Sequence, residues 1–298
     1  MSETWDGKTK GGLNGYKIFV FLLQKFGLNA AYVLLFFVSF WFVLFSTKAS
    51  KAQYYLFRKR LKYSFLKSLV SIYKNTFVFG QILIDKTAIM SGMLKKFTTE
   101  HTNADVIENM IKNNTGGILV NAHIGSWQIA GQLLERYKGV IYILMVDAEN
   151  EKIKDFLSVT EGANKVEIIP LKEDGSHMSE INDVLKNKGI LVMHGDRFTE
   201  GIDTVEQDFY GKKAKFPTGP FHLAAKYNVP VSFATAFREK NKHYHFFAMK
   251  PIDIDYPGNI KKRKEEIIIK QKKYVDELEK MMKKYPTQWF NFYNFWKT

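Results

Sequence analysis

The most apolar stretch of the chain runs from Leu28 to Ser46 and contains no charged residue. In a helix, residues rise by about 1.5 Å each, so this stretch just spans the hydrocarbon core of a bilayer. No small-residue cleavage site follows it, and Lys48 and Lys51 come next, so the pattern does not predict a signal peptide. It favours a membrane-anchoring helix over 28–46; a helix buried in a protein core is the alternative.

The segment after this span combines apolar and basic positions at helical spacing. Phe57, Leu61, Phe65 and Leu69 recur at every fourth residue, and four basic side chains lie among them. The basic residues are Arg58, Lys59, Arg60 and Lys62. The pattern predicts a basic amphipathic helix over 50–75 that lies on an anionic membrane surface.

From about residue 100, short apolar strands alternate with helical patterns. We expect strands at 118–122, 140–146, 166–170, 190–193, 229–236 and 244–249, and helices at 126–137, 179–187, 217–227 and 260–284. This alternation predicts an α/β fold with a largely parallel central sheet flanked by helices. No repeat or low-complexity linker interrupts it. We therefore expect a membrane-associating segment, 1–75, followed by one α/β domain, 76–298.

The charge distribution supports the membrane reading. The chain has 44 Lys and Arg residues against 30 Asp and Glu residues, a formal net charge of +14. Residues 1–75 hold twelve of the basic residues and only Glu3 and Asp6 as acids, so +10 of that charge lies there. More positive charge follows the apolar span than precedes it, which predicts a domain facing the cytoplasm. No helix-turn-helix, RNA-recognition or zinc-finger pattern occurs, so no nucleic-acid partner is expected.

Two predicted strand ends carry polar residues, and chemistry in parallel α/β sheets gathers at the carboxyl ends of strands. The first reads Asn121-Ala-His123-Ile-Gly125-Ser126-Trp127-Gln128, and the second reads Met193-His-Gly-Asp196-Arg197. Gly125 permits a tight turn and Ser126 can cap the following helix. His123 is then either a general base or a structural histidine. Asp196 and Arg197 form either part of a site or a structural ion pair in a turn.

The chain lacks the residues that several other chemistries need. It has no cysteine, which excludes disulfides, zinc–thiolate sites and a cysteine nucleophile. It also lacks the serine-hydrolase elbow, the phosphate-binding loops and the H-E-x-x-H zinc helix. A histidine that acts as a general base on a bound hydroxyl or amine is the simplest remaining chemistry. His243 and His245 alternate along a strand, and we expect them at the surface rather than on a metal.

At these residues the chain resembles a known family. The stretch His123 to Gln128 (HIGSWQ) is similar to the H-F-G-N-W-E form of the H-x4-D/E motif of the bacterial lipid A late acyltransferases, a branch of the lysophospholipid acyltransferase superfamily. Further pieces in the same order strengthen the resemblance: Trp5, the 27–32 approach to the apolar span, 195–197, 209–211, 214–220 and 285–296.

The resemblance implies a transferase at the bacterial inner membrane whose catalytic domain is cytoplasmic. It would move a fatty acyl chain from acyl carrier protein or coenzyme A to a lipid-linked acceptor, without a metal or cofactor. His123 would act as base, together with Gln128 and Asp196. The N–H groups of 125–127 or the Arg197 guanidinium would stabilise the oxyanion. The expected substrate-binding residues are Asn121, Gly125, Ser126, Trp127, Arg197, Thr218 and Gly219.

Gln128 departs from the family motif, which has an acid at this position. A neutral amide can hold the histidine ring but supplies no charge to the imidazolium. Three explanations are open: an engineered Glu→Gln change, a charge supplied by Asp196 instead, or a weakly active or inactive relative. The alternative function is therefore a protein that keeps the fold and binds acyl chains or a carrier protein. The aromatic residues of 289–296 would line an acyl pocket, or else pack or lie at the membrane interface.

Overall fold

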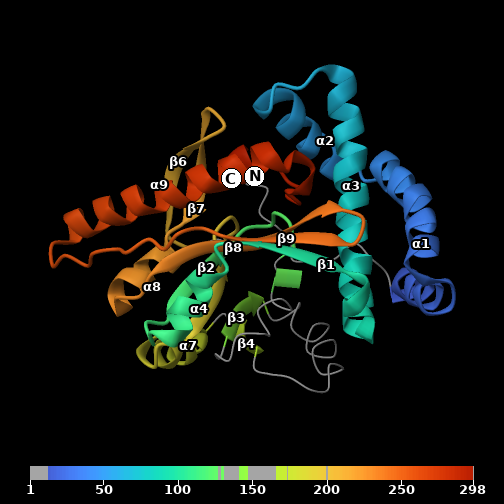
Figure 1. Ribbon diagram of the computed structural model, residues 1–298. Coiled ribbons are helices and arrows are strands. Elements are labelled where there is room, and N and C mark those ends of the chain that lie inside the picture. The colour runs from blue at the N-terminus through green and yellow to red at the C-terminus, as the bar shows by residue number, and fades with distance from the viewer. Residues whose placement is uncertain are drawn as a thin grey trace.

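A seven-stranded mixed sheet forms the centre of the computed structural model, which describes residues 13–126, 129–130, 141–146, 166–172, 174–198 and 201–297 (Figure 1). Its strand order is β1-β9-β8-β2-β5-β3-β4. The strands are β1 Thr98–Thr102, β2 Gly117–Asn121, β3 Ile141–Val146, β4 Val166–Leu171, β5 Ile190–His194, β8 Val231–Lys240 and β9 His243–Ala248. Neighbouring strands are parallel except for the antiparallel pair β8–β9. The predicted α/β fold with a largely parallel sheet is confirmed.

Helices cover both faces of this sheet. They include α4 Asp105–Lys112, α7 His177–Lys186, α8 Gly219–Tyr227 and α9 Ile260–Lys284. The alternation along β2 shows how the faces divide. Ile118 and Val120 pack in one buried cluster with side chains of α7, α8 and α9, whereas Leu119 packs in a second cluster with α1, α3 and α4. In Figure 1, α9 crosses the sheet on one side.

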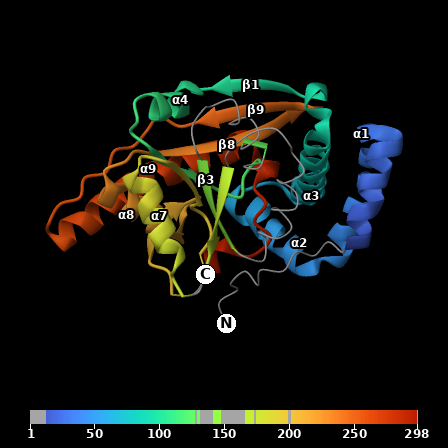
Figure 2. The same cartoon turned by 90° about the horizontal axis from the view of Figure 1, so that it is seen from below.

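The N-terminal helices lie at one end of the sheet. Helix α1 spans Leu13–Phe45 and α3 spans Phe65–Ala88; the two pack side by side, with α3 next to the sheet and α1 outside it (Figures 1 and 2). Helix α1 begins earlier than the predicted span 28–46. Gly27, with φ +79°, breaks its helical geometry directly before that span. The part from Ile18 to Phe45 is long and apolar enough to cross a membrane.

The segment predicted as one amphipathic helix over 50–75 is divided in the structure. Helix α2 spans Thr47–Tyr54, the π-helical turn η1 spans Tyr55–Arg60, and α3 starts at Phe65. Lys62 takes a left-handed conformation with φ +59°, and the Ser64 hydroxyl accepts the N–H of Lys67, so Ser64 caps α3. Because α3 continues to Ala88, the predicted boundary at 75/76 falls within a helix. The division into two domains stays a prediction.

Four elements of the described chain were missed by the sequence patterns: β1, α4 and the two strands of a hairpin, β6 Thr204–Phe209 and β7 Lys212–Pro217. The hairpin is rich in lysine, so it shows little hydrophobic pattern. Its turn residues, Tyr210 and Gly211, both have positive φ angles, as a two-residue hairpin turn requires. Pro217 ends β7, so α8 begins two residues later than predicted. The short turns are η2 Ile89–Met93, η3 Leu94–Lys96, η4 Pro286–Gln288 and η5 Phe295–Lys297.

Candidate functional site

The two polar strand ends lie side by side because β2 and β5 are neighbours in the sheet. Their register pairs Asn121 with His194, the last residue of each strand. The N–H of Gly195 then donates to the carbonyl oxygen of Asn121 at 2.8 Å. His123 and Asp196 follow two residues beyond these paired ends. The register of two parallel strands therefore brings together side chains that are far apart in the sequence.

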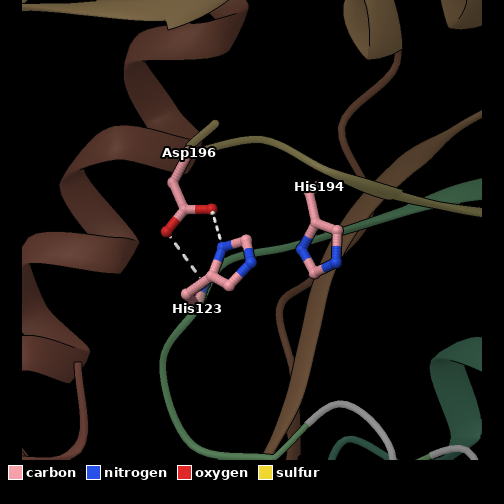
Figure 3. A group of neighbouring side chains, drawn as sticks. All are labelled: His123, His194 and Asp196. Atoms are coloured by element: carbon pink, nitrogen blue, oxygen red, sulfur yellow. Dashed lines mark hydrogen bonds and ion pairs between the residues drawn. The ribbon is translucent and has the colours of Figure 1, made fainter. Parts of the chain in front are cut away.

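His123 and Asp196 make two hydrogen bonds (Figure 3). The His123 Nδ1 and Asp196 Oδ1 atoms lie 2.8 Å apart, and the backbone N–H of His123 donates to Asp196 Oδ2, also at 2.8 Å. A carboxylate only accepts hydrogen bonds, so the proton of the neutral imidazole lies on Nδ1. In this tautomer the basic lone pair of the ring is on Nε2. The pair therefore has the orientation of a general base held by an acid.

Asp196 is fully buried and ionised. Burial by itself raises the pKa of its carboxyl, but the His123 imidazole and its hydrogen bond, with the Arg197 guanidinium, hold that pKa well below its ordinary range. The Trp289 indole N–H also donates to Asp196 Oδ2, at 3.2 Å. A buried charge needs such donors to offset the loss of water. The carboxylate keeps its charge at neutral pH and can stabilise a protonated His123.

His194 is a functional candidate that the sequence analysis missed. Its ring stacks on the His123 ring, with 4.3 Å between the centroids and 20° between the planes (Figure 3). Burial and the neighbouring His123 hold the pKa of His194 well below its ordinary value, against the opposing effect of Asp196. His194 is therefore neutral at pH 7. The sequence feature that could have indicated His194 is its position at the end of β5, directly before Gly195 and Asp196.

Gly125 and Ser126 build the turn that follows His123. Gly125 has φ +65°, and a Cβ atom there would lie 2.3 Å from the Ala236 carbonyl oxygen, so only glycine fits. The Ser126 hydroxyl accepts the N–H of Ile129 at 3.2 Å, the geometry of a helix cap.

This turn does not supply the oxyanion donors that the sequence analysis expected from these two residues. The Gly125 N–H donates to the Gln288 carbonyl at 2.8 Å, and the Ser126 N–H donates to the Ala236 carbonyl at 2.7 Å. Both N–H groups are thus engaged by the protein itself. Trp127 and Gln128 lie outside the residues that the structure describes. Among the described residues, Arg197 is the expected oxyanion donor that these hydrogen bonds do not exclude.

Arg197 and Asn121 flank the histidine–aspartate pair. Arg197 donates from Nη2 to the Phe290 carbonyl at 3.1 Å, and its guanidinium lies 6.0 Å from the centroid of the Tyr293 ring. Asn121 is buried, and its side-chain Oδ1 accepts no hydrogen bond within the described part of the chain. An unused buried acceptor beside a candidate site favours a bound polar group. Substrate binding by both residues stays a prediction.

Thr218 and Gly219 lie at the start of α8. The N–H and the hydroxyl of Thr218 both donate to the carbonyl oxygen of Asp203, at 3.0 and 3.1 Å. This links the helix start to the base of the β6–β7 hairpin. The substrate-binding role of these two residues also stays a prediction.

The C-terminal aromatic segment packs inside the protein. Trp289, Phe290, Phe295 and Trp296 are all buried. Trp289 forms an antiparallel bridge with Ile124, and the Phe290 N–H donates to the His123 carbonyl at 2.6 Å. Of the three alternatives from the sequence, packing is the one these four residues fulfil. The segment supports the turn that carries His123.

The cluster of His123, His194 and Asp196 also has the residue types of a metal site. His123, His194 and Asp196 place potential ligand atoms within 4.8 Å of one another, and these residue types suit zinc. However, three N–H groups already donate to the Asp196 carboxylate. That arrangement fits an anion held by hydrogen bonds better than a metal ligand.

His245 is buried, with Nδ1 near the Tyr285 hydroxyl, so its expected surface position was wrong.

The chain is similar to known proteins over most of its length. The family model described as bacterial lipid A biosynthesis acyltransferase matches residues 74–298. Among solved structures, the crystal structure of the 1-acyl-sn-glycerophosphate (LPA) acyltransferase PlsC from Thermotoga maritima is similar, with 15% identity and a TM-score of 0.40. The match covers 88% of this chain and 99% of that one. None of the curated proteins compared with the chain matches it.

Proposed function

Because the chain belongs to the bacterial lipid A biosynthesis acyltransferase family, we propose that it transfers a fatty acyl chain from a thioester to a lipid-linked acceptor. The donor is acyl carrier protein or coenzyme A, and the acceptor offers a hydroxyl or an amine. The observation that carries this proposal is the His123–Asp196 pair at the adjoining ends of β2 and β5. It supplies a positioned general base beside a buried negative charge.

The proposed reaction is one direct transfer. His123 Nε2 takes the proton from the acceptor O–H or N–H as that oxygen or nitrogen attacks the thioester carbonyl. The Asp196 carboxylate stabilises the imidazolium that forms. When the tetrahedral intermediate collapses, the carbon–sulfur bond breaks and the proton on Nε2 passes to the departing thiolate. The products are an ester or amide and a free thiol.

A thioester is already activated, so this chemistry needs no covalent enzyme intermediate and no metal. The negative charge that develops on the carbonyl oxygen still needs a partner. Arg197, which directly follows Asp196 in the chain, is the cation that we expect to stabilise this charge. Its guanidinium bonds to Phe290 on one side, which fixes its position beside the pair.

Membrane attachment by α1 and the start of α3 supports access to lipid-like substrates. Large apolar side chains on both helices are exposed; they include Phe36, Phe40, Trp41 and Phe45 of α1 and Phe65, Leu66, Leu69 and Val70 of α3. Exposed basic residues lie in the same stretch of chain, namely Arg58, Lys59, Lys62 and Lys67. An apolar surface with basic residues beside it suits an anionic bilayer. We therefore propose attachment to the cytoplasmic face of the bacterial inner membrane.

Acyl transfer with purified protein tests the proposal. The protein in detergent would be given acyl carrier protein or coenzyme A thioesters with a bacterial lipid extract, and thiol release and labelled lipid would be measured. His123→Ala should abolish transfer. His243→Ala is the control, because that histidine binds Thr98 between β9 and β1, away from the β2 and β5 ends. If the unaltered protein transfers no acyl chain from either donor, the alternative of an acyl-chain or carrier-binding protein is favoured.

A further inference from the structure

The C-terminal segment contacts the turn that carries the candidate base. Residues 288–290 run antiparallel to 123–125: the Gly125 N–H donates to the Gln288 carbonyl, and the Phe290 N–H donates to the His123 carbonyl. This places Trp289 directly beside the turn. Its indole N–H points to Asp196 Oδ2 at 3.2 Å.

The three donors to Asp196 are distributed unequally over its two oxygens. Oδ1 lies 2.8 Å from the Nδ1 atom of the His123 ring. Oδ2 accepts both the His123 backbone N–H and the Trp289 indole N–H. Two donors on one oxygen restrict rotation of the carboxylate. The other oxygen is thereby held toward the imidazole, where the proton must stay on Nδ1.

Trp289 is itself rigidly held. It is 1% exposed, and its ring lies 5.8 Å from that of Phe209 and 5.2 Å from that of Phe295, both edge to face. Its carbonyl accepts a hydrogen bond from Asn75 Nδ2 at 2.9 Å. Asn75, fully buried in α3, is in turn held by Gln53. A donor fixed by packing on all sides loses little entropy when it aligns a neighbouring group.

We propose that Trp289 is a positioning residue whose indole N–H fixes the Asp196 carboxylate in the orientation that holds His123 as a base. This rests on the proposed function of the His123–Asp196 pair. Trp289 touches neither substrate in this role; it acts through Asp196. Sequence alone could not indicate it, because the contact joins residues 93 positions apart.

Trp289→Phe tests the proposal, because phenylalanine keeps the aromatic packing and removes the donor. A hydrogen bond to a charged group is worth enough that its loss should lower kcat roughly tenfold to a hundredfold. KM for both substrates should stay within about threefold, since no substrate contact is lost.

Trp296→Phe is the matched control. Trp296 is also buried in the same aromatic cluster, but its indole N–H donates to the Phe209 carbonyl at 3.0 Å, not to Asp196. Its loss should change thermal stability by a comparable amount and leave kcat unchanged. Equal effects of the two changes on kcat would overturn the proposal.

The deciding experiment combines Trp289→Phe with Asp196→Asn. If Trp289 acts through Asp196, its replacement should cause no further loss of kcat once the carboxylate is gone. A full additional loss would overturn the proposal. If Asp196→Asn alone keeps the original rate, the proposed function of the pair fails instead, so the two failures are distinguishable.

A second replacement covers the case in which Trp289→Phe does not fold. Incorporation of 3-benzothienylalanine at position 289 keeps the shape of the indole and replaces its N–H by sulfur. The same loss of kcat is expected, in a protein that stays folded at the assay temperature. An unchanged kcat with this replacement would overturn the proposal, because only the donor has been removed.

Discussion

Asp196 binds His123 twice, once at the ring Nδ1 and once at the backbone N–H, with both distances at 2.8 Å. The carboxylate therefore fixes the imidazole relative to the main chain of the same residue. Rotation of the ring about its side-chain bonds would break the first bond while the second persists. The direction of Nε2 is thus set by one neighbouring carboxylate.

Asp196→Asn should reduce acyl transfer strongly. The Trp289 and His123 backbone N–H groups need an acceptor, so the amide oxygen of the asparagine would face them and its NH₂ would face Nδ1. The imidazole proton would then move to Nε2, so Nε2 could no longer accept the proton of the acceptor. A comparable amide replacement in serine proteases costs about 10⁴ in rate. Steady-state kinetics would measure the loss, and nitrogen NMR of the histidine would show the exchanged tautomer.

A smaller effect would count against this role of Asp196. If Asp196→Asn keeps more than about a tenth of the rate, the carboxylate does not orient His123 in the way that the serine-protease comparison implies. The thermal unfolding temperature should be recorded for the same sample. A protein that unfolds at the assay temperature would otherwise mimic loss of catalysis.

Gln128→Glu should change the rate less than tenfold. The family motif has an acid at this position, but Asp196 already occupies the Nδ1 side of His123. A second carboxylate would add charge but would not be needed to orient the ring, since Asp196 already does so and Nε2 must receive the proton of the acceptor. The measurement is kcat/KM of the two proteins with the same donor. An increase by orders of magnitude would show instead that Gln128 replaces the working acid.

The sequence was sufficient to find both halves of the candidate site. His123 and Asp196 each follow an apolar strand, and a parallel sheet places such residues at one edge. Their contact also required that β2 and β5 be neighbours with Asn121 opposite His194. Strand order and register depend on packing over the whole sheet, so the hydrophobic pattern predicted the strands but not their pairing.

Other contacts were missed for related reasons. Trp289 reaches Asp196 through a segment that has no regular pattern, and its aromatic residues resemble those of a membrane interface in the sequence. The strand Thr98–Thr102 carries no apolar alternation, because it pairs at the edge of the sheet and is mostly exposed. Local composition describes how buried a segment should be. It does not identify the partner against which the segment is buried.

His194 should make the protein less stable as the pH falls below about 6.5. Its pKa is lowered in the folded state, so the unfolded chain binds a proton near pH 6.5 that the folded chain does not accept. The stability is therefore complete above that pH and is lost as the pH falls. The titratable and charged groups that face it are His123, Asp196 and Arg197.

The measurement is the free energy of unfolding in urea at pH 7.5 and 5.5, in detergent. The original protein should lose about 1 kcal/mol more between these values than His194→Gln does. His194→Leu should show the same reduced dependence, because the effect comes from the missing titration and not from the new side chain. If all three proteins respond equally to pH, the shifted titration of His194 is refuted.

Asp85 should be essential for holding the N-terminal helices against the sheet. It lies fully buried in α3 and accepts hydrogen bonds from Arg238 Nε at 2.9 Å, from the Tyr244 hydroxyl at 2.6 Å and from the Tyr32 hydroxyl of α1. Arg238 belongs to β8 and Tyr244 to β9. One carboxylate thus joins α1 and α3 to two strands.

Asp85→Leu would leave the Arg238 guanidinium buried without its counter-charge, which costs about 3–5 kcal/mol in comparable buried pairs. Chemical unfolding in detergent should show this loss. Asp208→Asn is the matched control, since the Asp208–Lys213 pair is exposed and its removal should cost less than about 1 kcal/mol. Adding Arg238→Leu to Asp85→Leu should restore part of the stability, because the buried charge is then gone. If Asp85→Leu and Asp208→Asn unfold at the same denaturant concentration, the network does not hold these helices to the sheet.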